Sequence, residues 1–194
     1  VKGKSVFILG AGGSARAVAY GLAKRGARQI VIANRTLERA RKIVSDFKRL
    51  FPRVEFAVSS LRGGIPSEAE AISVRRLLRR PAKKLGGPPR NDDSWPREID
   101  LVVNATSVGL KPKDDALIQP KIFPHKTIFM DLIYNPAETE FLRLARKSGH
   151  RTLNGLGMLV HQGAAAFQLW TGRKAPVELM RRVAKAVIAR QRSQ

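Results

Sequence analysis

Near its amino terminus the chain carries a short apolar run that ends in a cluster of glycines. Residues 4–9 read Lys-Ser-Val-Phe-Ile-Leu and lead directly into Gly10-Ala-Gly-Gly-Ser-Ala15. An apolar run of this length is typical of a parallel strand that is buried on both faces. The glycines fit the G-x-G-x-x-G/A pattern of a strand-to-helix turn. In this pattern Gly10 permits the tight turn, Gly12 lets a ligand approach the backbone, and Ala15 lets the helix pack closely on the strand.

The rest of the sequence alternates between strand and helix patterns. Further strands are predicted at residues 29–33, 54–58, 100–106, 127–133 and 151–153. Helices are predicted at residues 14–26, 36–50, 137–148 and 157–170, followed by an amphipathic helix over 177–188. Gly26 is expected to end the first helix and Thr36 to cap the second. This alternation predicts a Rossmann-like α/β fold, a doubly wound, mostly parallel sheet with helices on both faces.

The glycine turn is also a candidate phosphate site. The backbone amides of Gly12, Gly13 and Ser14 would point outward from a helix N-terminus, where the helix dipole favours an anion. A glycine-rich turn without a ligand is the alternative interpretation. The position of the pattern between a strand and a helix favours the pyrophosphate of a dinucleotide, held by Gly10, Ala11, Gly12, Gly13 and Ser14.

The end of the second predicted strand distinguishes NADP from NAD. An acidic residue there would bond the ribose 2′-hydroxyl and repel a 2′-phosphate. This chain has Asn34, Arg35 and Thr36 instead, and Arg39 follows one helical turn later. Guanidinium groups can form paired hydrogen bonds to a phosphate. The alternative is that these are ordinary exposed arginines, but the missing acid favours NADP as the cofactor.

The chain is strongly basic, with 37 Lys and Arg against 15 Asp and Glu and a formal net charge of +22. Such an excess raises non-specific affinity for nucleic acid. The positive charges are spread over most of the chain, so we do not expect nucleic acid to be a biological partner. Residues 59–98 interrupt the strand and helix alternation, and we interpret them as a basic, solvated insertion with room for one helix at 68–80. Nucleic-acid binding through this segment is the alternative.

Composition also bears on metal sites and on location. The chain has no cysteine, which excludes disulfides and a catalytic thiol. His125, His150 and His161 lack metal-ligand spacing, so no metal site is predicted. No apolar run approaches the roughly 18 residues that span a bilayer, and the start does not read as a signal peptide. We therefore expect a cytoplasmic protein without a membrane partner.

Six motifs in this order and spacing resemble a known family. They are Val1-Lys-Gly-Lys, Gly10-Ala-Gly-Gly-Ser-Ala-Arg-Ala17, Asn34-Arg-Thr36, Asn104-Ala-Thr-Ser-Val-Gly109, Asp131-Leu-Ile-Tyr-Asn-Pro136 and Gly155-Leu-Gly-Met-Leu-Val-His-Gln162. Together they span nearly the whole chain, which resembles the NADP-binding C-terminal domain of shikimate dehydrogenase. The resemblance implies reversible hydride transfer between NADPH and 3-dehydroshikimate, a step of the shikimate pathway of aromatic amino acid biosynthesis.

The resemblance also implies roles for single residues. Thr106 and Ser107 would lie beside the cofactor, and the nicotinamide would be lined by Leu132, Gly155 and Met158. Tyr134 and Gln162 would reach the substrate, Gln162 through a hydrogen bond to a hydroxyl. The alternatives are that Tyr134 is a capping aromatic and Gln162 a solvated helix residue.

The chain departs from the family in one important respect. In the family a separate N-terminal domain binds most of the substrate and supplies a catalytic Lys–Asp pair, in which the lysine is assigned as proton donor. That pair cannot be carried over to any position here, because Asp131 belongs to a strand motif and Lys111 and Lys113 to a loop. No catalytic residue is therefore assigned. We expect an excised domain or half of a split enzyme, which binds NADP(H) but reduces 3-dehydroshikimate poorly or not at all.

Three further expectations stay open. A quinate/shikimate dehydrogenase is the alternative within the oxidoreductases, and a non-catalytic NADP(H)-sensing module is the alternative outside them. In the two-domain enzyme the last helix packs towards the substrate domain. We therefore expect an uncovered apolar face on that helix here, and self-association as its consequence.

Overall fold

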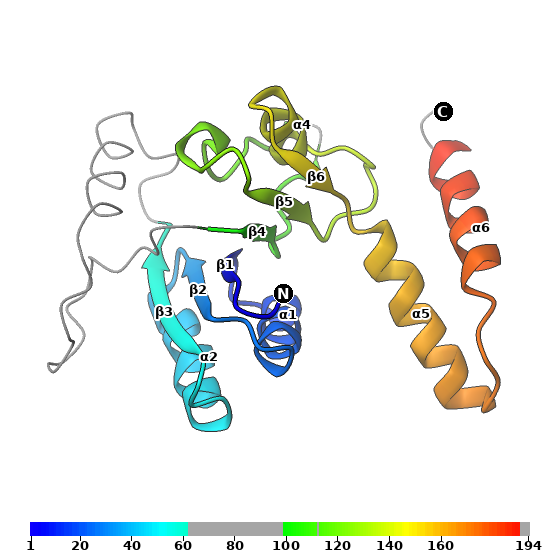
Figure 1. Cartoon of the computed structure of the whole chain (residues 1–194). Coiled ribbons are helices and arrows are strands. Elements are labelled where there is room, and N and C mark those ends of the chain that lie inside the picture. The colour runs from blue at the N-terminus through cyan, green and yellow to red at the C-terminus, as the bar shows by residue number, and fades with distance from the viewer. Residues whose placement is uncertain (62–98, 112, 191–194) are drawn as a thin grey trace, which may run out of the picture.

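The computed structural model describes residues 1–61, 99–111 and 113–190 (Figure 1). Six strands form one sheet in the order β3-β2-β1-β4-β5-β6, and every neighbouring pair is parallel. The strands are β1 (Ser5–Leu9), β2 (Gln29–Asn34), β3 (Glu55–Ser60), β4 (Leu101–Asn104), β5 (Ile128–Asp131) and β6 (Arg151–Leu153). The strand order reverses between β1 and β4, so the sheet is doubly wound, as the sequence predicted.

Helices cover both faces of the sheet (Figure 1). The helices are α1 (Gly13–Lys24) and α2 (Leu37–Leu50) on one face, and α4 (Glu140–Lys147) with the short 3-10 helix η1 (Pro120–Ile122) on the other. Alternate residues of β1 belong to the two layers. Val6 and Ile8 pack with α1 and α2, whereas Phe7 and Leu9 pack with α4. All four side chains are fully buried, which explains why β1 reads as an unbroken apolar run.

The ends of the first two helices test the capping predictions. Gly26 adopts a left-handed conformation with φ +78°, its amide bonds to the carbonyl of Ala23, and the Ala27 amide bonds to that of Leu22. This is the glycine-based ending that the sequence predicted. Thr36 does stand at the N-cap of α2, but its side chain makes no capping hydrogen bond. The predicted N-cap position is therefore confirmed, but the Thr36 hydroxyl does not form the capping bond.

Several element boundaries differ from the prediction, and the cause is clear for β3 and α4. β3 continues to Ser60, because residues 59 and 60 still pair with the end of β2, so the strand enters the range assigned to the insertion. The helix predicted at 68–80 lies outside the described residues. α4 begins at Glu140 and not at residue 137, because the Thr139 hydroxyl accepts the amide of Leu142 at 3.4 Å and caps the helix there.

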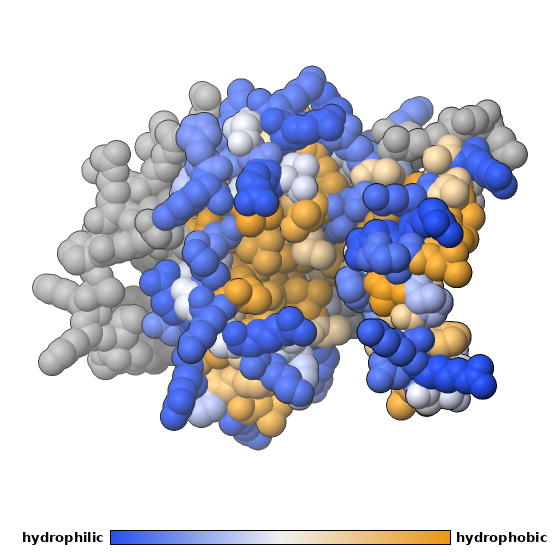
Figure 2. Space-filling model, turned by 45° about the vertical axis from the view of Figure 1, so that its right-hand side comes forward, coloured by the Kyte–Doolittle hydropathy of each residue, from blue (hydrophilic) through white to orange (hydrophobic). Residues whose placement is uncertain are grey.

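The last two helices, α5 (Leu156–Thr171) and α6 (Val177–Arg190), form a hairpin that extends to one side of the sheet (Figure 1). They pack on each other through Leu156, Val160 and Ile188. A second apolar row on α6, spaced four residues apart, is about half exposed and consists of Leu179, Val183 and Val187. Figure 2 shows apolar surface along this hairpin. In the part of the chain described here, no helix has the length and apolar character that crossing a membrane requires.

Candidate functional site

The predicted site residues gather at one edge of the sheet, where the parallel strands end. Residues 10–14 follow β1, residues 34–39 end β2 and begin α2, residues 106 and 107 follow β4, residues 132 and 134 follow β5, and residues 155–162 follow β6. The reversal of strand order between β1 and β4 falls in the middle of this edge. Ligands of open α/β sheets bind in the crevice that such a reversal creates.

The glycine turn after β1 has one crowded position and two open ones. Gly10 has φ +104°, and a Cβ atom on it would lie 2.9 Å from the Ala105 carbonyl oxygen. A Cβ on Gly12 or Gly13 would meet no protein atom within 4 Å. The first helical hydrogen bond of α1 is donated by Arg16 to Gly12, at 3.0 Å, so the amides of residues 13–15 have no acceptor within the helix. The turn is thus an open cradle of backbone donors, which fits a pyrophosphate.

The end of β2 presents basic side chains to solvent. Arg35, Thr36 and Arg39 are exposed, and the half-buried Asn34 donates its side-chain amide to the Thr36 carbonyl oxygen at 2.8 Å. The acid of the first turn of α2, Glu38, pairs loosely with Arg41 at 3.5 Å. The strand end itself carries no carboxylate. The charge at this position therefore suits a second phosphate group.

A carboxylate that the sequence reasoning did not use lies between β4 and β5. Asp131, the last residue of β5, is in register with Asn104, the last residue of β4, and is fully buried. It accepts hydrogen bonds from the Asn104 side-chain amide at 3.1 and 3.2 Å, the Ile133 amide at 3.0 Å and the Thr139 hydroxyl at 2.7 Å. Burial raises the pKa of Asp131 above its ordinary value, although the bonds from Thr139, Ile133 and Asn104 oppose that rise.

Asn104 connects this carboxylate to Thr106. The side-chain oxygen of Asn104 accepts from the Thr106 hydroxyl at 2.7 Å and from the Thr106 amide at 3.1 Å. The Thr106 oxygen accepts in turn from the Val108 amide at 3.1 Å. The available signal for Asn104 and Asp131 was that each is a polar residue ending an otherwise apolar run. Their alignment across the two strands was not visible in the sequence.

The start of α5 packs on the turn that follows β5. The Gly155 amide donates to the Ile133 carbonyl oxygen at 2.9 Å, and a Cβ on Gly155 would lie 1.9 Å from the Leu132 carbonyl oxygen. Met158 packs against the core cluster that contains Leu132. The structure thus brings Leu132, Gly155 and Met158 together.

The two predicted substrate residues are less constrained. Tyr134 is 38% exposed, and Gln162 is exposed on α5.

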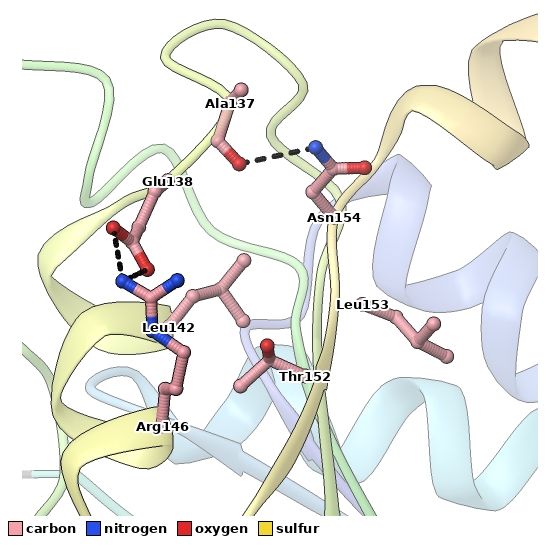
Figure 3. A pocket seen from close by; sticks show the side chains of 7 residues that line it. All are labelled: Ala137, Glu138, Leu142, Arg146, Thr152, Leu153 and Asn154. Atoms are coloured by element: carbon pink, nitrogen blue, oxygen red, sulfur yellow. Dashed lines mark hydrogen bonds and ion pairs between the residues drawn. The ribbon is translucent and has the colours of Figure 1, made fainter.

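A pocket of about 440 Å³ lies elsewhere, between α4 and β6 (Figure 3). Its polar groups are largely satisfied by one another. Arg146 pairs with Glu138 at 2.7 Å, and the Asn154 amide donates to the Ala137 carbonyl oxygen at 3.0 Å. None of the predicted cofactor or substrate residues lines it. The strand-end residues described above therefore lie outside this pocket.

Two family models match the chain. The model described as "Shikimate / quinate 5-dehydrogenase" matches residues 1–60, and "Shikimate 5'-dehydrogenase C-terminal domain" matches residues 155–185. These two segments contain the glycine turn with the end of β2, and the start of α5. They are the parts of the site that the motifs at Gly10 and Gly155 had indicated.

Individual proteins give the same result. The shikimate dehydrogenase (NADP(+)) of Methanopyrus kandleri is 39% identical over 182 residues, which cover 93% of this chain and 53% of the relative. A solved shikimate dehydrogenase in complex with NADP+ superposes with a TM-score of 0.73 at 33% identity, covering 97% of this chain and 56% of that one. The ligand-free 5-ketofructose reductase of Gluconobacter sp. strain CHM43 has a TM-score of 0.75 at 31% identity, with coverage of 96% and 57%.

The chain spans about half the length of the proteins that it matches. Over that half, the similarity in sequence and the similarity in fold agree with each other and with the six motifs. The resemblance noted in the sequence is confirmed, and the chain is a homologue of the shikimate dehydrogenases.

Proposed function

We propose that this chain binds NADP(H) as the cofactor-binding part of a shikimate dehydrogenase, which reversibly reduces 3-dehydroshikimate to shikimate. The observation that carries the proposal is the open glycine cradle after β1 beside a strand end that has exposed arginines and no carboxylate. NADPH, when bound, supplies the hydride. The protein supplies binding, orientation and the exclusion of water.

Different residues of the chain bind different parts of the cofactor. The amides of Gly12, Gly13 and Ser14 hold the pyrophosphate, and the Arg35 and Arg39 guanidinium groups hold the 2′-phosphate by charge-assisted hydrogen bonds. Ala11, Asn34 and Thr36 complete these two subsites. Around the nicotinamide ring we propose Thr106, Ser107, Leu132, Gly155 and Met158. Tyr134 and Gln162 face the substrate side.

Among the described residues we assign none as the proton donor beside the substrate carbonyl. Lys111 and Lys113 are exposed on a loop, and the Asp131 carboxylate is buried and accepts several hydrogen bonds. We therefore propose that an N-terminal domain supplies the Lys–Asp pair, and that this chain alone has little or no activity. The length of the relatives, about twice the matched region, supports this view.

The hairpin of α5 and α6 is the surface that we assign to that domain. In addition to the row of Leu179, Val183 and Val187, the hairpin carries Leu169 and Trp170 near its tip, each 82% exposed. An apolar surface of this kind marks a contact with another protein surface. In the isolated chain we expect the same surface to cause self-association.

Calorimetric titration with NADPH and NADH tests the cofactor assignment. We expect tighter binding of NADPH, and a fall in that preference by at least about 100-fold in the double variant Arg35→Ala/Arg39→Ala, because charged hydrogen bonds contribute about 1.5–3 kcal/mol each. Arg49→Ala, an exposed arginine at the other end of α2, is the matched control and should change neither affinity. Equal affinity for NADH and NADPH in the wild-type chain would refute the assignment.

The substrate and the catalytic role are tested separately. The N-terminal half of the Methanopyrus kandleri relative is added in trans, and NADPH oxidation is followed with 3-dehydroshikimate, with the dehydro form of quinate and with 5-ketofructose. Turnover of 3-dehydroshikimate by the mixture, but not by the chain alone, is the expected result. Cofactor binding without turnover of any substrate would favour the NADP(H)-sensing module. An affinity for duplex DNA that falls steeply with salt concentration, without cofactor binding, would favour a nucleic-acid role.

A further inference from the structure

We propose that Asp131 is a positioning residue for the nicotinamide half of the site, and that it acts through Asn104 on the loop after β4 and through Ile133 on the turn after β5. The inference rests on the proposed cofactor function. Asp131 itself has no exposed surface, so it contacts neither solvent nor a ligand directly. Its effect has to pass through the groups that it binds.

The first group is the Asn104 side chain, whose orientation the network determines. Its nitrogen faces the Asp131 carboxylate and, at 3.0 Å, the Val108 carbonyl oxygen. Both of these partners accept hydrogen bonds. On the opposite side lies the Thr106 amide, which can only donate. If the Asn104 amide were reversed, its oxygen would face the two acceptors and its nitrogen would face the Thr106 amide donor. Only the observed orientation therefore satisfies every partner.

The fixed Asn104 oxygen then fixes Thr106. The Thr106 hydroxyl has one proton, which it donates to Asn104 at 2.7 Å, and its oxygen accepts the Val108 amide. With the hydroxyl held in this way, the methyl group of Thr106 packs over the glycine turn, where a Cβ on Gly10 would lie 3.0 Å from it. The carboxylate therefore controls how the loop after β4 meets the loop after β1.

The second and third groups lie at the two ends of the connection between β5 and α4. The Ile133 amide, at 3.0 Å, ties the turn after β5 to the carboxylate, and that turn carries the Leu132 carbonyl oxygen against Gly155. The Thr139 hydroxyl ties in the start of α4, and the Thr139 methyl group would lie 3.1 Å from a Cβ on Gly109. One side chain that only accepts hydrogen bonds thus holds the loop after β4 and both ends of the connection between β5 and α4. An amide in its place would turn a donor toward at least one of these donors.

The test compares the whole cofactor with a fragment of it. Adenosine 2′,5′-bisphosphate carries the 2′-phosphate and one phosphate of the pyrophosphate but lacks the nicotinamide, so it reports on the end of β2 and the glycine turn and not on the nicotinamide half of the site. For Asp131→Asn we expect the affinity for NADP+ to fall about tenfold, the effect of one charged hydrogen bond, and the affinity for the fragment to change by less than about twofold. Asn104→Ala, which removes the link between Asp131 and Thr106, should have the same selective effect. It keeps the test decisive if Asp131→Asn does not fold.

Asp100→Asn is the matched control. Asp100 also binds a backbone amide, that of Ser5 at 2.9 Å, but it lies at the opposite end of β4. Its replacement should leave the ratio of the two affinities unchanged. An equal loss for NADP+ and for the fragment in Asp131→Asn would show a role in folding only, and unchanged affinity for both would show no role. Either result overturns the proposal.

Amide hydrogen exchange in the ligand-free protein gives a second readout. In Asp131→Asn, but not in Asp100→Asn, exchange at the Val108 and Ile133 amides should rise about tenfold, because both amides depend on the carboxylate network. Unchanged exchange at both would overturn the proposal. If the wild-type chain bound neither NADP+ nor the fragment, the proposed function would fail, while the exchange rates would still decide whether Asp131 orders these loops.

Discussion

Substitution of Gly155 by alanine is expected to destabilise the protein through a single steric contact. The backbone at Gly155 has φ −73° and ψ −3°, a right-handed conformation that alanine adopts without strain. The new Cβ, however, would lie 1.9 Å from the Leu132 carbonyl oxygen. Real Cβ contacts shorter than 3.0 Å are essentially absent, so the two backbones must separate by at least 1.1 Å.

The cost can be worked out from the groups that have to move. Overpacking of a buried contact costs about 1–3 kcal/mol, and here the neighbour is backbone and cannot change rotamer. The separation also strains the 2.9 Å hydrogen bond from the Gly155 amide to Ile133, which contributes about 1 kcal/mol. We expect a total loss of about 2–4 kcal/mol. For a chain of this size that corresponds to a fall in Tm of roughly 10 °C.

Gly157 provides the control, because a Cβ there would meet no atom within 4 Å. It lies inside α5, where alanine is favoured over glycine by about 0.5–1 kcal/mol. Thermal and urea unfolding of the two variants should therefore shift in opposite directions. If Gly155→Ala were as stable as Gly157→Ala, the packing of α5 on the turn after β5 would not be as described.

Three further outcomes are expected. Burial is the main cause that raises the pKa of Asp131 above 3.8, so the folded state binds this proton more tightly than the unfolded state. The stability of the wild type relative to Asp131→Asn should therefore increase as the pH is lowered through the raised pKa towards 3.8. At Asp100 the effect of burial is outweighed by the Ser5 amide and the Lys4 ammonium group, which lower the pKa. The stability of the wild type relative to Asp100→Asn should therefore decrease as the pH falls below about 3.8. Urea titrations at several pH values measure both stability differences, and the same pH dependence for Asp131→Asn and Asp100→Asn would refute the argument. Gly10→Ala should cost about 2 kcal/mol in unfolding experiments, because φ +104° and the 2.9 Å contact with Ala105 both disfavour a side chain. Val183→Glu on the exposed row of α6 should make the chain more monomeric in sedimentation experiments without changing its Tm by more than about 2 °C. If the wild type self-associates and the variant has the same sedimentation profile, this row is not the contact.

The elements that could be predicted are those determined by local pattern. The apolar run of β1 and the glycines after it specify a buried strand and a turn, and they are found as predicted. On α2, Ala40, Ile43, Val44 and Phe47 are spaced by three or four residues, share one face of the helix and are all buried. On α1, Ala15, Ala19 and Ala23 are buried, but Val18 and Leu22 are only half-buried.

The features that could not be predicted depend on contacts between distant segments. Asn104 and Asp131 meet only because β4 and β5 pair in one register, which no local pattern specifies. The close approach of Gly155 to Leu132 likewise depends on how α5 leaves the sheet. At Thr36 the residue type favoured a hydroxyl cap, yet the local backbone leaves that hydroxyl unused for capping.

The attachment of α5 has a mechanical consequence. The helix has 16 residues, so it is about 24 Å long, and it is anchored at one end by Gly155 against the turn after β5. A change of about 10° in its direction at this anchor would move Trp170, at the other end, by about 4 Å. The helix therefore acts as a lever arm, which converts a small rearrangement beside the strand ends into a large displacement of whatever surface rests on the far end of the hairpin.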